Sequence, residues 1–84
     1  MKPIVFTTHA RDQCSERGAT EAEVVTTIRS GEKVAAKRGQ HGYRMNFQYH
    51  DVWSGRRYAI KQVLAIVAEE SNALVVVTVY TFYF

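Results

Sequence analysis

The chain has almost no cysteine and no long apolar run near its start. Cys14 is its only cysteine, so an intramolecular disulfide or a cysteine-based zinc cluster cannot form, and a reducing compartment is expected. The apolar run at Ile4, Val5 and Phe6 is far shorter than a signal-peptide core. Residues 73–84, although uncharged, fall short of the roughly 20 residues that a membrane helix needs. We therefore expect a cytoplasmic protein that does not enter a membrane.

The motifs of several enzyme classes are also missing. The three histidines are far apart in the sequence, and no H-x-x-x-H or histidine–carboxylate spacing predicts a metal site. Neither a glycine-rich phosphate loop nor a nucleophile elbow is present, and Cys14 has no histidine at a recognisable spacing. We predict no metal and no cofactor, which leaves any chemistry to His, Arg, Lys, Thr and Tyr.

The length of 84 residues indicates one domain, residues 1–84, because a chain of this size buries only a little over roughly 60% of its unfolded surface. Its net charge of +3 is unevenly spread. Seven basic residues oppose only Asp51 in the central stretch: Lys33, Lys37, Arg38, Arg44, Arg56, Arg57 and Lys61. Such a stretch attracts phosphate. The alternative is that these are ordinary solvated charges.

Two short helices are expected first. Thr8 is a suitable N-cap for a helix over about residues 9–17. Thr20 and Glu23 form the T-x-x-E capping box of a second helix, which ends at Gly31. Both helices are too short to persist alone, so they are expected to pack on a larger element.

After the helices the apolar pattern changes to a period of two, which is typical of strands. Strands are predicted over residues 32–37, 43–49, 57–68 and 74–84, with turns at residues 39–42, 54–55 and 70–72. Helices followed by a sequential meander predict an α+β fold, in which the two short N-terminal helices cover one face of a four-stranded antiparallel sheet.

The last predicted strand carries no charge, whereas edge strands are usually protected by charge or proline. It is therefore expected inside the sheet or against a partner. Val75, Val77 and Val79 are predicted to pack under the helices, which leaves Thr78 and Tyr80 on the opposite face.

That opposite face is predicted to combine cations, hydroxyls and an aromatic ring, a mixture suited to phosphate attraction and base stacking. Its members are Arg44, Asn46, Gln48, His50, Lys61, Thr78 and Tyr80. The alternative is the plain solvent face of a small sheet.

His9 is expected in the first turn of the first helix, where unpaired N–H groups and the helix dipole favour an anion. Beside a bound phosphate, an imidazole there could act as a general base, with Arg11 or Arg17 as the neighbouring cation. The alternative is that His9 helps to cap the helix or packs on an aromatic ring.

Three short strings, in this order, resemble a small uncharacterised bacterial domain family: F-T-T-H-A-R at residues 6–11, E-R-G at residues 16–18 and V-V-T-V-Y at residues 76–80. That family is similar to the barnase, EndoU, colicin and RelE superfamily of small ribonucleases. The resemblance implies two N-terminal helices on a four-stranded antiparallel, RelE-like sheet and RNA cleavage without metal, often as a toxin. Its polar motif positions correspond to His9, Arg17, Thr78 and Tyr80.

We therefore predict a metal-independent endoribonuclease that acts on RNA and is the toxin of a toxin–antitoxin pair, with an antitoxin protein as its partner. The catalytic residues would be His9, Arg17, Thr78 and Tyr80, and the RNA-binding residues Arg11, Arg44, His50 and Lys61. The alternatives are a non-catalytic module that binds nucleic acid or protein, and a structural homodimer that pairs through the C-terminal strand.

Overall fold

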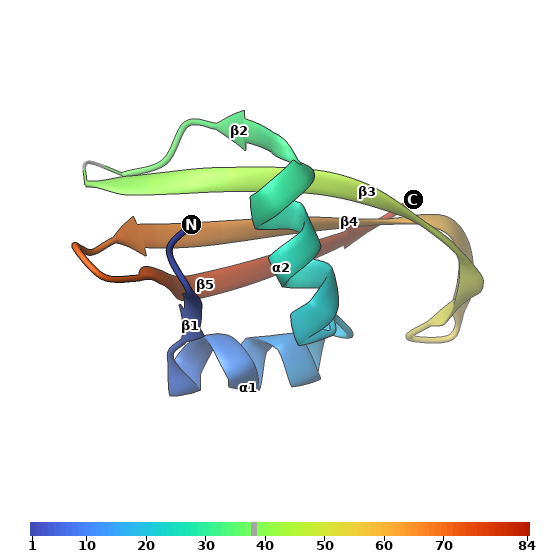
Figure 1. The fold of residues 1–84 in the computed structure, drawn as a ribbon. Helices are drawn as coiled ribbons and strands as arrows, with labels where there is room; N and C mark the ends of the chain where they lie inside the picture. The colour runs from blue at the N-terminus through green and yellow to red at the C-terminus, as the bar shows by residue number, and fades with distance from the viewer. Residues whose placement is uncertain (38) are drawn as a thin grey trace.

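The computed structural model of the protein describes residues 1–37 and 39–84; Arg38, one of the basic residues of the central stretch, lies outside this part. The described elements follow one another along the chain (Figure 1) as β1 (Ile4–Phe6), α1 (Thr8–Arg17), α2 (Glu21–Ser30), β2 (Glu32–Val34), β3 (Gln40–Trp53), β4 (Arg56–Glu69) and β5 (Leu74–Tyr83). The fold is α+β, with two helices ahead of a meander of four strands. No helix in the described ranges has the length and apolar character needed to cross a membrane.

The sheet has the strand order β1-β5-β4-β3-β2. The strands from β2 to β5 are antiparallel neighbours, but β1 runs parallel to β5 and pairs Ile4 with Leu74 and Phe6 with Val76. The predicted four-stranded antiparallel, RelE-like sheet is therefore wrong, because the sheet has five strands and is mixed. Three apolar residues in a row show no alternation, so only the pairing with the other end of the chain makes residues 4–6 a strand.

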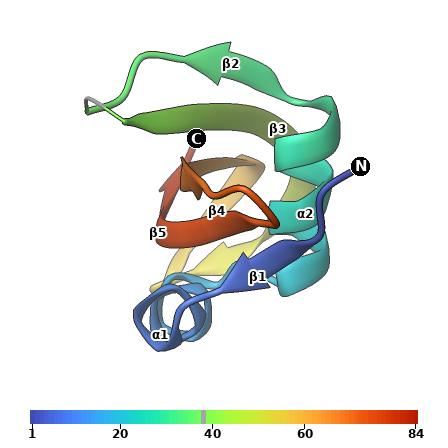
Figure 2. The same ribbon diagram turned by 60° about the vertical axis from the view of Figure 1, so that its left-hand side comes forward.

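The helices begin close to their predicted starts. Thr7 is the N-cap of α1 in place of Thr8, since its Oγ1 accepts a hydrogen bond from the Ala10 backbone N–H at 3.0 Å. The capping box of Thr20 and Glu23 at the start of α2 is confirmed. α1 packs along β5, while α2 crosses β4 and β3 (Figures 1 and 2). We call the side of the sheet under the helices the covered face and the other side the open face.

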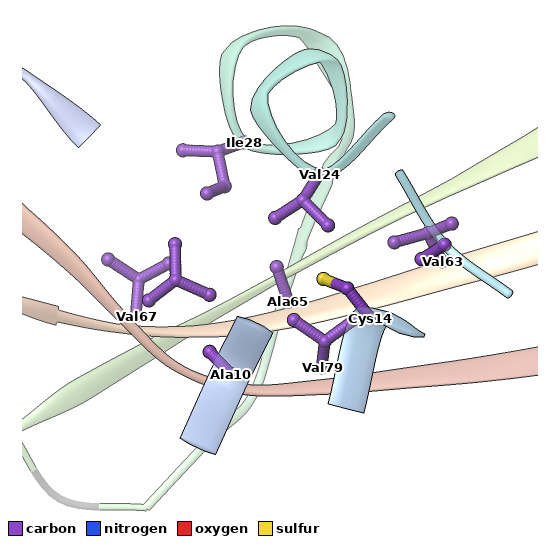
Figure 3. Close-up of a cluster of buried hydrophobic side chains, with 10 residues drawn as sticks. Ala10, Cys14, Val24, Ile28, Val63, Ala65, Val67 and Val79 are labelled. Carbon is purple, nitrogen blue, oxygen red and sulfur yellow. The ribbon is translucent and has the colours of Figure 1, made fainter. Parts of the chain in front are cut away.

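The core between helices and sheet is built from small side chains (Figure 3). Its buried members are Ala10, Cys14, Ala19, Val24, Ile28, Val63, Ala65, Val67, Val76 and Val79. Such side chains let helix and sheet approach closely, and each methyl group there is packed on all sides.

β5 contains a bulge that changes which of its valines are buried. Val76 pairs with Val67 and Thr78 with Ile66, so Val77 is an extra residue on β5. Such an extra residue shifts the alternation of side chains between the two faces. Val76 and Val79 are consequently the buried pair, and the prediction that Val75, Val77 and Val79 share the covered face is wrong.

The far end of the β3–β4 hairpin bends toward the end of α1 (Figure 1). A register shift between Gln48 and Asp51 marks the bend. Beyond it the Trp53 ring stacks on Tyr83, with ring centroids 5.0 Å apart. Gly18, at φ 77°, ends α1 beneath these rings, where an added Cβ would lie 2.6 Å from Trp53. This aromatic contact joins the hairpin to the helix.

Candidate nucleic-acid interface

Beyond β1, the outer edge of β5 is partly covered by one stripe of α1 side chains. β1 pairs only with residues 74–76 of β5. At Val79 the strand's N–H donates to Gln13 Oε1 at 2.8 Å, and its carbonyl accepts from Arg17 Nη1 at 2.6 Å. Side chains four residues apart share one side of a helix, so His9, Gln13 and Arg17 form a single stripe that faces this edge.

His9 is the free end of that stripe. Its side chain is exposed, and its ring has no hydrogen-bond partner within residues 1–37 and 39–84. It lies roughly 12 Å from Arg17 along the helix axis, which is eight residues of helical rise. Two extended side chains can jointly span that distance to one bound group.

Arg17 connects the edge of β5 to the open face. Its guanidinium carbon lies 5.0 Å from the centre of the Tyr80 ring, a cation–π contact. The guanidinium uses one donor on the Val79 carbonyl and has further N–H groups for another acceptor. Tyr80 is 40% exposed. The pair therefore presents a cation and a phenol to solvent at the same place.

Next to this pair the open face has a hollow of about 330 Å³. Its lining residues are Ala36, Lys37, Gln40, Ile66, Val77, Thr78 and Tyr80. The floor is apolar, while an ammonium, an amide and two hydroxyls stand around it. This volume is at the lower end of the range of about 300–1,000 Å³ typical of small-ligand sites. A hollow of this chemistry suits an aromatic ring that carries an anionic group.

The structure thus brings three of the four predicted catalytic residues together. Arg17 contacts Tyr80, and Tyr80 lines the hollow together with Thr78. His9 lies on the same helix stripe, at the other end of α1. Arg11 does not join them, because it faces the start of α2 and forms an exposed ion pair with Glu21 at 3.4 Å.

Two of the predicted RNA-binding residues are on strand β3. Arg44 lies on the open face, opposite Leu64, and forms an ion pair with Glu32 of β2. His50 lies at the bend of the hairpin with φ 49°, and its Nε2 is 2.7 Å from Gln48 Oε1. Arg44 is therefore in the same row of the sheet as Tyr80, whereas His50 is distant from the hollow.

Lys61 is not on the open face, and its placement there was wrong. Its register puts it with the buried residues of β4, and only 6% of it is exposed. Its Nζ lies 2.8 Å from Glu23 Oε1, donates to the Gly18 carbonyl at 2.9 Å and stands over the Tyr49 ring. These contacts tie β4 to the turn between the helices, which is a structural role.

Sequence reasoning did not assign Gln13 or Gln40 to the site, and it named Lys37 only as one of the basic residues of the central stretch. Gln13 is 7% exposed and fixes the edge of β5, and the signal for it was an amide next to the apolar positions of α1. Lys37 and Gln40 flank the turn between β2 and β3, and nothing in the sequence shows that this turn closes one side of a hollow.

Among residues 1–37 and 39–84, no three His, Cys, Asp or Glu side chains gather where they could hold a metal ion. Burial, followed by the charges of Glu21 and Glu23, raises the pKa of the Cys14 thiol. A buried thiol of this kind is a weak nucleophile, so Cys14 serves as a core residue.

Comparison with known proteins identifies a family for this chain. No curated protein and no solved structure matches the chain significantly. The family model described as "Domain of unknown function (DUF4258)" matches residues 6–81, which include both helices and almost the whole sheet. The chain therefore belongs to the DUF4258 family.

Proposed function

We propose that this domain binds RNA beside the hollow of its open face and cleaves it without a metal ion. The contact between Arg17 and Tyr80 at the hollow carries the proposal. A phosphate diester needs a cation that neutralises its charge and donors that hold it in line, and guanidinium groups provide both. Lys37, at the other wall of the hollow, adds a second positive charge.

The reaction is an internal transesterification. The ribose 2′-oxygen attacks the adjacent phosphorus, and the bond from phosphorus to the 5′-oxygen breaks, which leaves a 2′,3′-cyclic phosphate and a 5′-hydroxyl. The proton of the 2′-hydroxyl moves to a base, and the leaving oxygen receives a proton from an acid. Here His9 serves one of these transfers, Arg17 neutralises the phosphate, and Thr78 and Tyr80 orient it.

The sequence resemblance supports the same activity. The F-T-T-H-A-R and V-V-T-V-Y strings lie within the part of the chain that matches the DUF4258 family. They are the strings that resemble a small uncharacterised bacterial domain family, and the link from that family to the small ribonucleases is part of the proposal. His9 comes from the first of these strings, Thr78 and Tyr80 come from the second, and Arg17 comes from the E-R-G string at residues 16–18.

The test is cleavage of end-labelled mixed RNA by the purified protein in the presence of a metal chelator. We expect products with cyclic phosphate ends. His9→Ala and Arg17→Ala should each lower the rate by about 100-fold or more. Arg29→Ala is the matched control, because Arg29 is an exposed cation at the end of α2 that contacts the Lys2 carbonyl instead of the hollow.

Circular dichroism verifies that each variant is folded, since Arg17 also contacts Val79. Intact RNA after incubation with folded wild-type protein would refute cleavage. Equal rates for wild type and His9→Ala would remove the assigned role of His9. Cleavage that stops on chelation would refute the metal-independent step.

The proposal extends to a toxin that an antitoxin protein neutralises. Induced expression of the wild type should then arrest bacterial growth, whereas His9→Ala at the same protein level should not. Equal growth arrest by wild type and His9→Ala would mean that the toxicity does not come from RNA cleavage by His9.

A further inference from the structure

Three aromatic side chains lie on the open face, two from β5 and one from Phe84 directly after it. Tyr80, Phe82 and Phe84 are 40%, 44% and 63% exposed. Tyr80 and Phe82 lie opposite Leu64 and Gln62 of β4. Phe84 exchanges backbone hydrogen bonds with Ile60 of β4 at 3.0 and 3.1 Å. We call these three residues the aromatic stripe.

The intervening residues confirm that the stripe faces away from the helices. Thr81 and Tyr83 both donate their hydroxyl hydrogen to the Arg17 carbonyl, at 2.8 and 2.7 Å, on the covered face. Side chains alternate along a strand, so the stripe residues point the other way. No described helix or loop of the chain lies over Phe82 or Phe84, as their exposure shows.

The spacing of the stripe suits nucleobases. Every second residue of a strand is separated by roughly 7 Å. This distance is roughly twice the spacing of roughly 3.4 Å between successive nucleotides of one strand, so successive rings can contact alternate bases. Stacking of bases on aromatic side chains is how sheet surfaces hold single-stranded nucleic acid.

The charge around the stripe favours a polyanion. Residues 74–84 contain no charged side chain, and Arg44, in the same row as Tyr80, is paired with Glu32. Arg17 contacts the first ring, and Lys37 stands at the hollow beside it. A second copy of the chain would bring these cations against themselves, whereas RNA supplies both negative charge and aromatic faces.

We propose that the aromatic stripe is a stacking platform for single-stranded RNA, which it leads to the hollow at Thr78 and Tyr80. This inference rests on the proposed RNA-directed function and names its substrate class. A duplex keeps its base faces inside the stack, so it cannot use the stripe. Phe82 and Phe84 thus become binding residues, separate from the residues assigned to cleavage.

The experiment measures binding of a fluorescent 2′-O-methyl RNA strand, which cannot be cleaved because the attacking hydroxyl is blocked. The test variant is Phe82→Leu with Phe84→Leu, which keeps apolar side chains but removes both rings, and leaves Tyr80 unchanged. The control is Val52→Ala, since Val52 is 49% exposed but lies on the β3–β4 hairpin. Circular dichroism and sedimentation verify folding and monomer size.

We expect the double variant to bind the single strand at least about tenfold more weakly than wild type, and the control to bind as wild type does. A duplex of the same sequence should bind wild type more weakly than the single strand. Equal affinity for strand and duplex, or no loss in the double variant, would overturn the platform. Absence of any RNA binding, with a change of oligomeric state in the double variant, would make the stripe a protein interface instead.

Cleavage assays separate this result from that of the proposed function. Binding that depends on the rings, without cleavage by wild type, would leave the platform standing and refute the ribonuclease. If wild type and the double variant cleaved RNA at the same rate and bound it with the same affinity, the ribonuclease would stand and the platform would be refuted.

Discussion

The two faces of strand β4 carry apolar side chains of different size. On the covered face of β4, Val63, Ala65 and Val67 are fully buried against the helices. The alternate residues of the same strand include Leu64 and Ile66, which are larger and only half-buried. The aromatic stripe of β5 extends this open surface. Along β4 the larger apolar groups therefore lie on the open face, while the large core side chains of the covered face, such as Tyr43 and Phe47, come from β3.

This difference shows what each face is for. Close packing of small side chains stabilises the fold and leaves no room for a ligand. Exposed apolar groups in a contiguous patch mark interaction sites more often than chance exposure does. The covered face is thus the stability surface of the domain, and the open face is where binding and catalysis should be sought.

The strongest test of the comparison uses two adjacent residues of β4. Val63→Asp places a charge among buried valines with no partner, and we expect the protein to be unfolded, because the penalty approaches the whole stability of a small domain, about 5–15 kcal/mol. Leu64→Asp, on the open face, should cost about 1–2 kcal/mol and leave the protein folded. Urea unfolding followed by circular dichroism measures both. A folded Val63→Asp would show that the helices do not cover this face.

A second comparison uses one cation from each face. Lys61→Ala leaves Glu23 and the Gly18 carbonyl without their buried partner, so the free energy of unfolding should fall by about 2–4 kcal/mol. Arg44→Ala breaks an exposed ion pair with Glu32 and should lower it by less than about 1 kcal/mol. Urea unfolding again gives both values. Similar losses for the two variants would contradict the assignment of Lys61 to the covered face.

Two glycines test how much the contact between the Trp53 and Tyr83 rings on the covered face matters for stability. Gly18 and Gly55 both have positive φ, 77° and 82°, but only Gly18 has side chains of Trp53 and Tyr83 where a Cβ would lie. Gly18→Ala should cost about 2–3 kcal/mol, since steric displacement adds to backbone strain. Gly55→Ala should cost about 1 kcal/mol from strain alone. Equal urea unfolding midpoints for Gly18→Ala and Gly55→Ala would mean that the Trp53 and Tyr83 rings move aside without a cost in stability.

Much of the covered face could be predicted from local sequence. The capping box at Thr20 and Glu23 marks the start of α2, and Ala10 and Cys14 recur at helical spacing. The alternation in β3 also showed which side chains share a face. These signals are local, because each depends on residues within one or two turns of each other.

The remaining features depend on contacts between distant parts of the chain. The pairing of Ile4 with Leu74 and the bulge at Val77 are set by partners far away in sequence, and the bulge changed the assignment of the β5 valines. The alternation along β4 does not show which of its two faces meets the helices, so the sequence left Lys61 open to assignment to the open face. For the site, Thr78 and Tyr80 were placed together correctly, while Gln13, Lys37 and Gln40 become apparent only when strand, helix and turn meet.

The smallest expected effect concerns Tyr83, whose hydroxyl donates to the Arg17 carbonyl at 2.7 Å on the covered side. Burial, the largest cause, raises the pKa of this phenol above its ordinary 10.0. The folded protein therefore favours the neutral phenol, and the resulting contribution to stability is complete below pH 10.0 and is lost as the pH rises through the folded-state pKa. Stability should thus decline at alkaline pH.

Tyr83→Phe should lower the free energy of unfolding by about 1 kcal/mol at neutral pH, because the hydrogen bond is lost, and should lose less stability above pH 10.0 than wild type does. Tyr58→Phe is the control, since its ring lies 5.7 Å from Tyr83 but its hydroxyl makes no hydrogen bond within the described residues. Urea midpoints on both sides of pH 10.0 give the comparison. If wild type and Tyr83→Phe lost stability in parallel, the alkaline loss would come from other groups, and the Tyr83 hydroxyl would be as accessible to water as those on the open face.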